Sequence, residues 1–305
     1  MLAPQDARLL ELADLGVLHA RGADATSFLQ GQLSSDVARL GSSGQLAGLH
    51  NPQGRVIALL RLARLSEEDI LLILPRTLAA PVLARLRRFV LRAKVRLEDA
   101  SARWRVRGRV AAGLEAAAAP QAAPGVLRLT VDPQRALELI EHVATAEAAS
   151  AAPGAAGPAP ALESLGAWTL LDIAAGLPQV FPETSESFVA QMLNLDLIGG
   201  IAFDKGCYTG QEVIARAHYR GRVKRRMQRF RSVSPTRLAP GDRGRLPDGR
   251  AFQVVSVAAL GDGRCEFLAV APLAQDAHEE GEEPGAAAAP ATLEAVALEL
   301  PYALP

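Results

Sequence analysis

The segment with the clearest chemical character is residues 205–212, which read KGCYTGQE. Glycines stand on both sides of the cysteine, a lysine stands two residues before it, and a helix is predicted to begin after it. Backbone N–H groups at a helix N-terminus and a nearby lysine both favour the thiolate form of Cys207. Glycines let the backbone approach a ligand closely or adopt a positive φ. The sequence therefore predicts a functional thiol at Cys207, with a buried structural cysteine in a tight loop as the alternative.

The remaining metal-ligating and nucleophilic side chains are isolated. Cys265 lies among apolar residues in the middle of a predicted strand, so we expect it in the core. Two cysteines cannot build a four-thiolate metal site or a disulfide framework. His50 and His218 have no carboxylate or cysteine at metal-ligand spacing. The sequence therefore predicts no metal site.

The elements around the 205–212 segment alternate between strands and helices, which predicts an α+β fold. Strands are expected at 46–49, 56–65, 70–74, 94–97, 104–110, 223–231, 251–260, 265–270 and 292–298. Helices are expected at 26–30, with Asp24 as N-cap and Gly31 as an interruption, and at 77–90, 135–149 and 162–175. Residues 150–161 read SAAPGAAGPAPA and predict a spacer, and 275–291 predict a disordered acidic insertion.

The composition is that of a globular protein. The chain has 305 residues, of which 49% are hydrophobic and 22% charged, which suggests about two domains. No apolar run approaches the roughly 18 residues that a membrane helix needs. Three acidic residues near the N-terminus argue against a basic targeting peptide, so we expect a cytoplasmic protein without a membrane partner.

The net charge of zero conceals an uneven distribution. Between Val213 and Gly241 there is no acidic residue, while eight Lys and Arg side chains fall between Arg216 and Arg231. Such a stretch can face an anionic partner. The alternative is a solvated strand edge on which arginines block edge-to-edge pairing.

Several blocks in order give the chain a resemblance to a known family. The octapeptide KGCYTGQE is the most specific of them, and the others are FLQGQ at 28–32, NPQGR at 51–55, IAAGLP at 173–178 and QMLNLD at 191–196. Together they resemble the YgfZ family of folate-binding proteins, bacterial relatives of the mitochondrial iron–sulfur assembly factor. This family is similar in fold to the T-protein, or aminomethyltransferase, of the glycine cleavage system.

The resemblance implies an architecture and a site. It implies an aminomethyltransferase-like folate-binding region over 1–230, a ferredoxin-like subdomain inserted at 46–149, and a C-terminal β-barrel over 231–305. It also implies a tetrahydrofolate cofactor, iron–sulfur client proteins as partners and a monomeric state. Cys207 would be the functional thiol, and the implied folate-binding residues are Asn194, Lys205, Gly206, Tyr208, Gly210, Gln211, Glu212 and Arg55.

The chain departs from aminomethyltransferases at two positions that matter for chemistry. Relatives place paired aspartates just after the N-x-x-G turn, where this chain has Ala58 and Leu59. An alkyl side chain cannot exchange a proton with a folate nitrogen. Relatives also place a pteridine-gripping glutamate at the position of Ala174, and Asp172 lies about 200° away from it around a helix. Both departures argue against glycine cleavage.

Two functions from different classes follow from the resemblance. The first is an accessory factor in iron–sulfur protein maturation or repair that binds folate, acts through Cys207 and supports tRNA modification indirectly. The second is a tetrahydrofolate-dependent one-carbon transferase with an unknown acceptor. We favour the first. Direct tRNA contact by residues 216–231 is disfavoured, because only Tyr219 and Phe230 are available there for base stacking.

Overall fold

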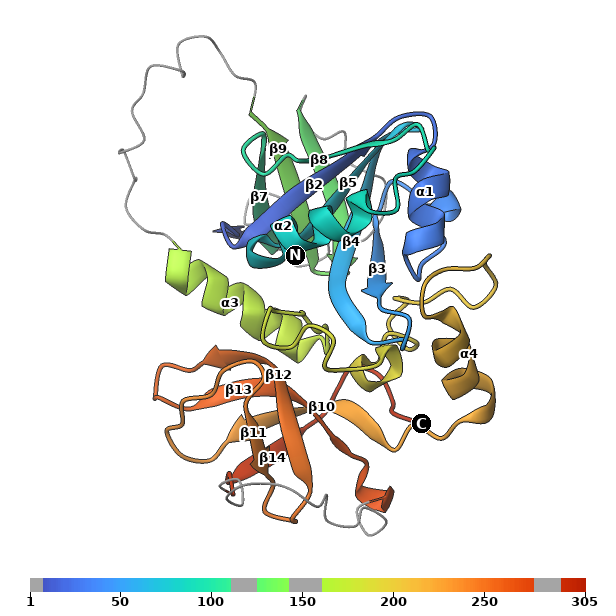
Figure 1. Ribbon diagram of the computed structural model, residues 1–305. Coiled ribbons are helices and arrows are strands. Elements are labelled where there is room, and N and C mark those ends of the chain that lie inside the picture. The colour runs from blue at the N-terminus through green and yellow to red at the C-terminus, as the bar shows by residue number, and fades with distance from the viewer. Residues whose placement is uncertain (1–7, 111–124, 143–160, 277–291) are drawn as a thin grey trace. The chain divides into compact units, whose positions relative to one another are not determined.

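The computed structural model describes residues 8–110, 125–142, 161–276 and 292–305 (Figure 1). The chain forms two compact units. The first unit comprises Met1–Gln30, Asp36–Ala47 and Leu60–Trp168, and the second comprises Gly31–Ser35, Gly48–Leu59 and Thr169–Pro305. The second unit therefore gathers two short N-terminal segments onto the C-terminal half of the chain. The predicted spacer lies outside the described residues except for Ala161, and so does the predicted insertion except for 275 and 276.

The first unit contains a five-stranded sheet in the order β3-β4-β5-β2-β6, two strands of which extend into the second unit. Its strands are β2 (Leu15–Arg21), β3 (Gln45–His50), β4 (Val56–Ser66), β5 (Asp69–Pro75) and β6 (Arg96–Asp99). Helix α2 (Arg76–Arg87) packs on this sheet through Leu78, Val82 and Leu86, which recur at helical spacing. The alternation of strands and helices confirms the predicted α+β class.

A four-stranded sheet in the order β1-β7-β9-β8 completes the first unit. Its strands are β1 (Arg8–Glu11), β7 (Trp104–Val110), β8 (Val126–Asp132) and β9 (Arg135–Glu141). Apolar side chains from both sheets form one core, in which Trp104 and Leu71 are buried. Helix α3 (Ala161–Ala174) adds Trp168, whose ring lies where a Cβ at Gly108 would stand.

One predicted helix is wrong. Residues 135–149 are rich in Ala, Leu and Glu, which favour helices, yet the described part of this segment is strand β9. Leu137 and Leu139 point into the core two residues apart, and Glu138 lies between them in register with Arg107 of β7. Pairing with β7 on one side and β8 on the other therefore makes this segment a strand, although its residues favour a helix.

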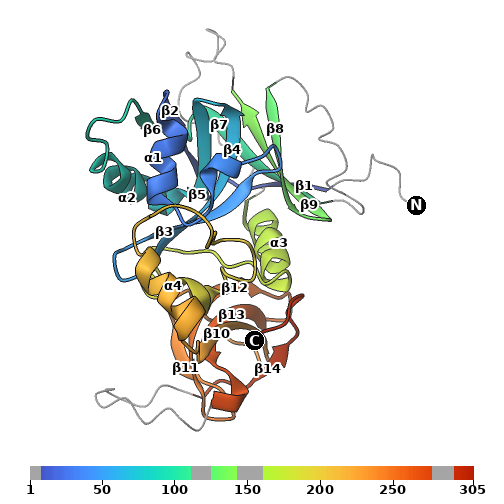
Figure 2. The same cartoon turned by 90° about the vertical axis from the view of Figure 1, so that its right-hand side faces the viewer.

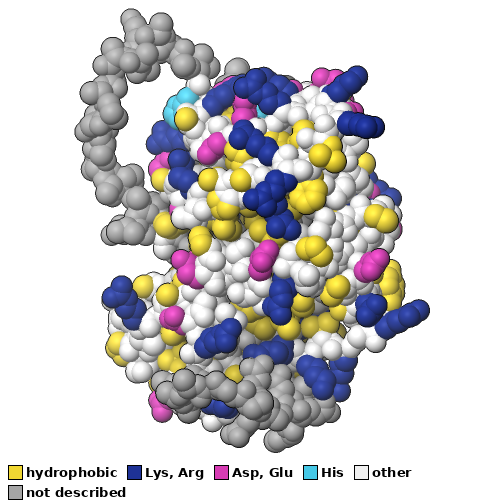
Figure 3. Space-filling model, in the orientation of Figure 1, with side chains coloured by type: hydrophobic (Ala, Val, Ile, Leu, Met, Phe, Trp, Pro, Cys, Tyr) yellow, Lys and Arg dark blue, Asp and Glu magenta, His cyan; other side chains and the backbone are white. Residues whose placement is uncertain are grey.

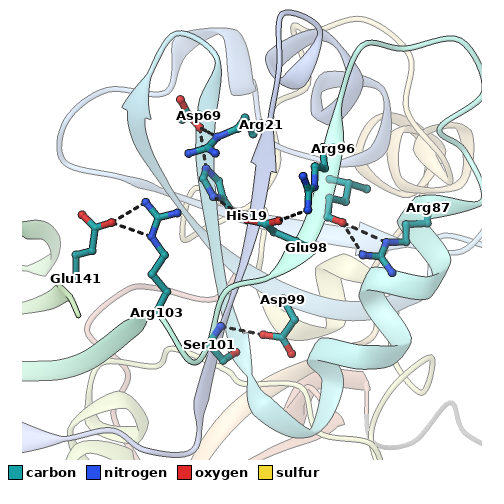
Figure 4. Close-up of polar contacts among 11 residues, drawn as sticks. His19, Arg21, Asp69, Arg87, Arg96, Glu98, Asp99, Ser101, Arg103 and Glu141 are labelled. Atoms are coloured by element: carbon teal, nitrogen blue, oxygen red, sulfur yellow. Dashed lines mark hydrogen bonds and ion pairs between the residues drawn. The ribbon is translucent and has the colours of Figure 1, made fainter. Parts of the chain in front are cut away.

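A polar cluster links three strands of the five-stranded sheet in the first unit (Figure 4). His19 on β2 is fully buried, and its Nε2 lies 2.9 Å from Oδ1 of Asp69 on β5. Its Nδ1 lies 3.8 Å from Glu98 on β6, and Arg21 donates to Asp69 at 2.8 Å. Burial lowers the pKa of His19 below its usual value, although Asp69 opposes this effect. The cluster holds strands together around a neutral imidazole.

The second unit contains a five-stranded sheet in the order β11-β12-β13-β10-β14 (Figure 2). Its strands are β10 (Arg225–Ser232), β11 (Arg243–Arg245), β12 (Ala251–Ala259), β13 (Cys265–Pro272) and β14 (Ala295–Leu298). In its core Phe230 stacks on Phe267, and Phe252 lies tilted against Phe267. An isolated parallel bridge joins Arg245 of β11 to Thr292, three residues before β14. Strand β10 runs through the predicted boundary at 230.

Two further helices lie near the predicted motifs. Helix α1 (Ala25–Gln32) continues through Gly31, which was expected to interrupt it. The Asp24 carboxylate accepts the backbone N–H of Lys94 at 2.6 Å, so it fastens a neighbouring segment to the start of α1. Helix α4 (Gln211–Arg220) begins after the cysteine, as predicted, and Gly210 directly precedes it. Among the described residues, no helix is long and apolar enough to cross a membrane.

Candidate functional site

The structure brings the 205–212 loop against the turn at 51–54, and both lie in the second unit. Gly210 precedes α4 with a φ of +84°, a conformation that L side chains rarely adopt. A Cβ at this position would also lie 2.5 Å from the carbonyl oxygen of Asn51. Gly210 is therefore required for two independent steric reasons, and its role is to let the turn and the helix start meet.

The turn at 51–54 also has a glycine where it meets α4. Gly54 has a φ of +72°, and a Cβ there would lie 3.1 Å from the Cβ of Val213 on α4. The Asn51 side chain closes the turn, because its Oδ1 accepts the backbone N–H groups of Gln53 and Arg55 at 3.0 Å each. Two motifs that are about 155 residues apart in the sequence thus form one structural unit.

Lys205 anchors the N-terminal end of the loop. Its Nζ donates to the carbonyl oxygens of Leu33 at 2.6 Å and Ser35 at 2.7 Å, and it lies 5.1 Å from the centre of the Tyr208 ring. The ammonium group predicted to line a folate site therefore fastens the loop to residues 33–35. Because the Lys205 ammonium group donates to two backbone carbonyls, its role in the structure is to position the loop.

Tyr208 and His50 form the buried underside of the loop. Tyr208 is 7% exposed, and burial raises the pKa of its phenol to about 12. His50 on β3 is fully buried with its ring centre 6.2 Å from that of Tyr208. Burial lowers the pKa of His50 to about 4. Both groups are uncharged at neutral pH, and neither ring nitrogen of His50 has a hydrogen-bond partner within the described ranges.

Asn194 belongs to a buried network. It is fully buried in the left-handed region at φ +57°, where it ends a short 3₁₀ helix at 190–193. Its Nδ2 donates to the Met227 carbonyl at 2.9 Å and to Tyr302 Oη at 3.3 Å. Its Oδ1 accepts from Arg226 at 3.4 Å. The amide predicted to contact folate is therefore engaged with three protein groups.

An ion pair that the sequence did not reveal completes this network. Arg226 of β10 makes a bidentate pair with Asp196, with both N–O distances at 2.9 Å and side chains that are 5% and 7% exposed. Tyr302 donates to the carbonyl of Gly176 at 2.7 Å, and burial raises the pKa of its phenol. Hydrogen bonds of the Asn194 side chain link Tyr302 to Arg226, and no local sequence pattern indicates this network.

Five predicted site residues have side chains or backbone that reach the surface. Cys207, Gly206 and Glu212 are exposed, and Gln211 is half-buried. A Cβ at Gly206 would meet nothing within 4 Å, so no contact inside the described structure requires glycine there. Arg55 is exposed and donates from one guanidinium nitrogen to the Ser187 carbonyl at 2.7 Å. Glu212 and Arg216, four residues apart on α4, make no ion pair in the structure as described.

The positions that carry acids in aminomethyltransferases are apolar here. Ala58 and Leu59 on β4 are buried at 0% and 2% exposure. Asp172 and Ala174 both lie on α3, about 200° apart around its axis. The structure therefore gives no carboxylate at either predicted position, which agrees with the departures seen in the sequence.

The basic run divides into internal and surface parts. Arg226 is buried against Asp196, while Arg229 and Arg231 both pair with the buried Glu266, Arg229 at 2.7 Å. Burial raises the pKa of Glu266, but the two arginines outweigh it and leave that pKa below its usual value. Strand β10 lies between β13 and β14, so the alternative of a solvated strand edge is wrong.

The second cysteine is buried. Cys265 begins β13 instead of lying mid-strand, and its Sγ lies 3.7 Å from the Ser232 hydroxyl. Burial raises the pKa of its thiol. Within the described ranges no group of three or more His, Cys, Asp or Glu residues is arranged to hold a metal ion.

Comparisons with known proteins identify relatives and a fold neighbour. The chain is 34% identical over 235 residues to the tRNA-modifying protein YgfZ of an Enterobacter species, covering 71% of this chain and 69% of that protein. It is 31% identical to the protein of the same name from Edwardsiella ictaluri, covering 86% and 83%. It is also 32% identical to an uncharacterised Haemophilus influenzae protein, covering 73% of each.

A solved structure shares the fold. The glycine cleavage system aminomethyltransferase T of Bartonella henselae superposes with a TM-score of 0.64 at 16% identity, covering 87% of this chain and 78% of that one. This similarity establishes the aminomethyltransferase-like fold. No profile of a protein family matches the chain.

Proposed function

Because the chain belongs to the YgfZ family, we propose that it is a folate-binding accessory factor for the maturation or repair of iron–sulfur proteins. In this proposal the protein works as a monomer in the cytoplasm, uses Cys207 as its functional thiol and supports tRNA modification indirectly. The relatives are named as tRNA-modifying proteins, and the fold neighbour as an aminomethyltransferase.

The observation that carries this proposal is an exposed thiol on an anchored loop. Lys205 fastens one side of Cys207 to residues 33–35, and the buried Tyr208 fastens the other. Cys207 itself is exposed and forms no disulfide. A thiol held in a fixed position at the surface can meet a client protein, whereas Cys265 is buried in a sheet core.

Folate would be held by the polar groups that the fold leaves accessible. Gln211 and Glu212 lie in the first turn of α4, and Gly206 leaves open space beside the loop. Arg55 would pair with the anionic glutamyl tail, because its guanidinium is exposed and carries further donors. These groups fit folate chemically, while Asn194, Lys205, Tyr208 and Gly210 would shape the site from behind.

We also propose two subdomains within this fold. We place a ferredoxin-like subdomain at 46–149 and a closed barrel at 231–305. The bridge between Arg245 and Thr292 supports the barrel, because it brings one edge of the five-stranded sheet to the segment before the other edge strand.

A matched pair of glycine substitutions tests the folate proposal. At both Gly206 and Gly261 a Cβ would meet open space, and neither has a positive φ. Gly206→Ala and Gly261→Ala should therefore both fold with normal thermal stability. Titration calorimetry with tetrahydrofolate should show weaker binding for Gly206→Ala alone. Equal affinity of the two variants would mean that folate does not approach the loop backbone.

Substitution of the thiol tests the accessory role. In a cell that lacks the native gene, Cys207→Ser should fail to restore the activity of iron–sulfur enzymes, although it folds and binds tetrahydrofolate. Full restoration would contradict the proposal. A one-carbon transferase, which the fold neighbour suggests, would consume a methylene or formyl donor in proportion to product. We expect no such consumption.

A further inference from the structure

Three aromatic rings gather on the outer side of helix α4. The rings of Phe203 and His218 stack in parallel, with centres 3.8 Å apart and planes 19° apart. Tyr219 stands edge-on to both, 4.8 Å from His218 and 6.1 Å from Phe203, and is 68% exposed. Phe203 comes from the segment before the cysteine loop, so the cluster joins residues that the sequence separates by 15 positions. We refer to these three residues as the aromatic cluster.

Unpaired positive charge surrounds this cluster. Arg216, Tyr219 and Arg220 lie three and four residues apart and therefore share one face of α4. Both arginines are exposed, and neither makes a hydrogen bond or ion pair with another described residue. Glu212 is the single acidic residue of α4, and it lies in the opposite, first turn. Lys and Arg side chains project from the α4 region in the space-filling view (Figure 3).

This combination is suited to one kind of partner. Aromatic side chains accept any nucleobase by stacking, because every base has a π-face, and exposed arginines neutralise the phosphates between bases. Interfaces for proteins also use Tyr and Arg, but they bury an apolar centre. The only large aliphatic side chain exposed on α4 is Val213, at 41%.

We propose that the aromatic cluster, together with Arg216 and Arg220, binds single-stranded RNA by base stacking and phosphate contact. This goes beyond the proposed function, which requires no RNA contact. The sequence disfavours direct RNA contact by residues 216–231, because it offers only Tyr219 and Phe230 for base stacking. Phe230 is in fact buried at 1% exposure, and Phe203 and His218 take its place beside Tyr219.

Fluorescence anisotropy with a labelled 12-nucleotide single-stranded RNA tests the proposal. Tyr219→Ala should weaken binding by about 5-fold or more, since stacking one base on an aromatic ring contributes at least this factor. Tyr219→Phe should bind like the wild type, because the ring is kept. The double variant Arg216→Gln/Arg220→Gln should lower the slope of log K against log salt by about 1.4, or about 0.7 for each lost phosphate contact.

A matched control removes the same charge elsewhere. Arg237 and Arg243 are exposed in the same unit, and neither side chain makes a hydrogen bond or ion pair with another described residue. Arg237→Gln/Arg243→Gln should leave the salt slope unchanged. The proposal is overturned if the wild type shows no saturable binding at low salt, if the control lowers the slope equally, or if Tyr219→Ala binds normally. Titration of Tyr219→Ala with tetrahydrofolate should remain normal, which separates this result from a failure of the folate proposal.

Discussion

Replacement of His50 should remove a specific part of the pH dependence of stability. His50 is fully buried beneath the cysteine loop, and its imidazole lies so close to Gly48 that a Cβ there would collide with it. Neither ring nitrogen has a hydrogen-bond partner among the residues described, so an apolar side chain leaves no partner unsatisfied. His50→Leu and His50→Phe are therefore suitable variants that cannot be protonated.

The magnitude follows from the pKa. Burial lowers the pKa of His50 from 6.5 to about 4, so the unfolded chain binds the proton more tightly than the folded protein does. The contribution of His50 to the free energy of unfolding is therefore complete above pH 6.5. It is lost as the pH falls from 6.5 through 4. One pKa unit corresponds to about 1.36 kcal/mol, so the loss between pH 7 and pH 4 is about 3 kcal/mol.

Urea denaturation at intervals from pH 7 to pH 4 measures this difference. The free energy of unfolding of the wild type should fall more steeply with decreasing pH than that of either His50 variant, because His19 and the carboxylates titrate equally in all three proteins. His142→Gln, which alters an exposed histidine, should follow the wild type. Parallel curves for the wild type and both His50 variants would refute the argument that His50 is buried and neutral.

Three further outcomes follow from the structure. Cys265→Ser should lower the free energy of unfolding by about 1 kcal/mol in a urea titration, because the new hydroxyl enters an apolar core but has the Ser232 hydroxyl within reach. Asp196→Asn should cost on the order of 3–5 kcal/mol by the same measurement, since it leaves Arg226 charged and unpaired at 5% exposure. An assay with aminomethylated carrier protein and tetrahydrofolate should release no ammonia, because β4 carries Ala58 where aminomethyltransferases have an acid; appreciable release would contradict the alignment at this strand.

Local sequence determined many of the elements and singled out the segment at 205–212. Helical spacing of apolar residues predicted α2, and apolar segments bounded by turn residues predicted α3 and most strands. Glycine-containing turns at 51–54 and around Gly210 were also apparent, since a positive φ favours glycine locally. The segment at 135–141 was wrong because its residues favour a helix in isolation, and only pairing with strands from elsewhere made it β9.

The roles of the site residues were decided by tertiary contacts. The resemblance grouped Lys205 and Asn194 with the other implied folate-binding residues, but their hydrogen-bond partners come from residues 33–35, β10 and the C-terminus. Likewise, the run of arginines reads as one basic stretch. The structure buries Arg226 against Asp196 and leaves Arg216 at the surface, because a strand and a helix direct neighbouring side chains to different surroundings. A sequence specifies which charges are present, whereas their burial and pairing depend on residues distant along the chain.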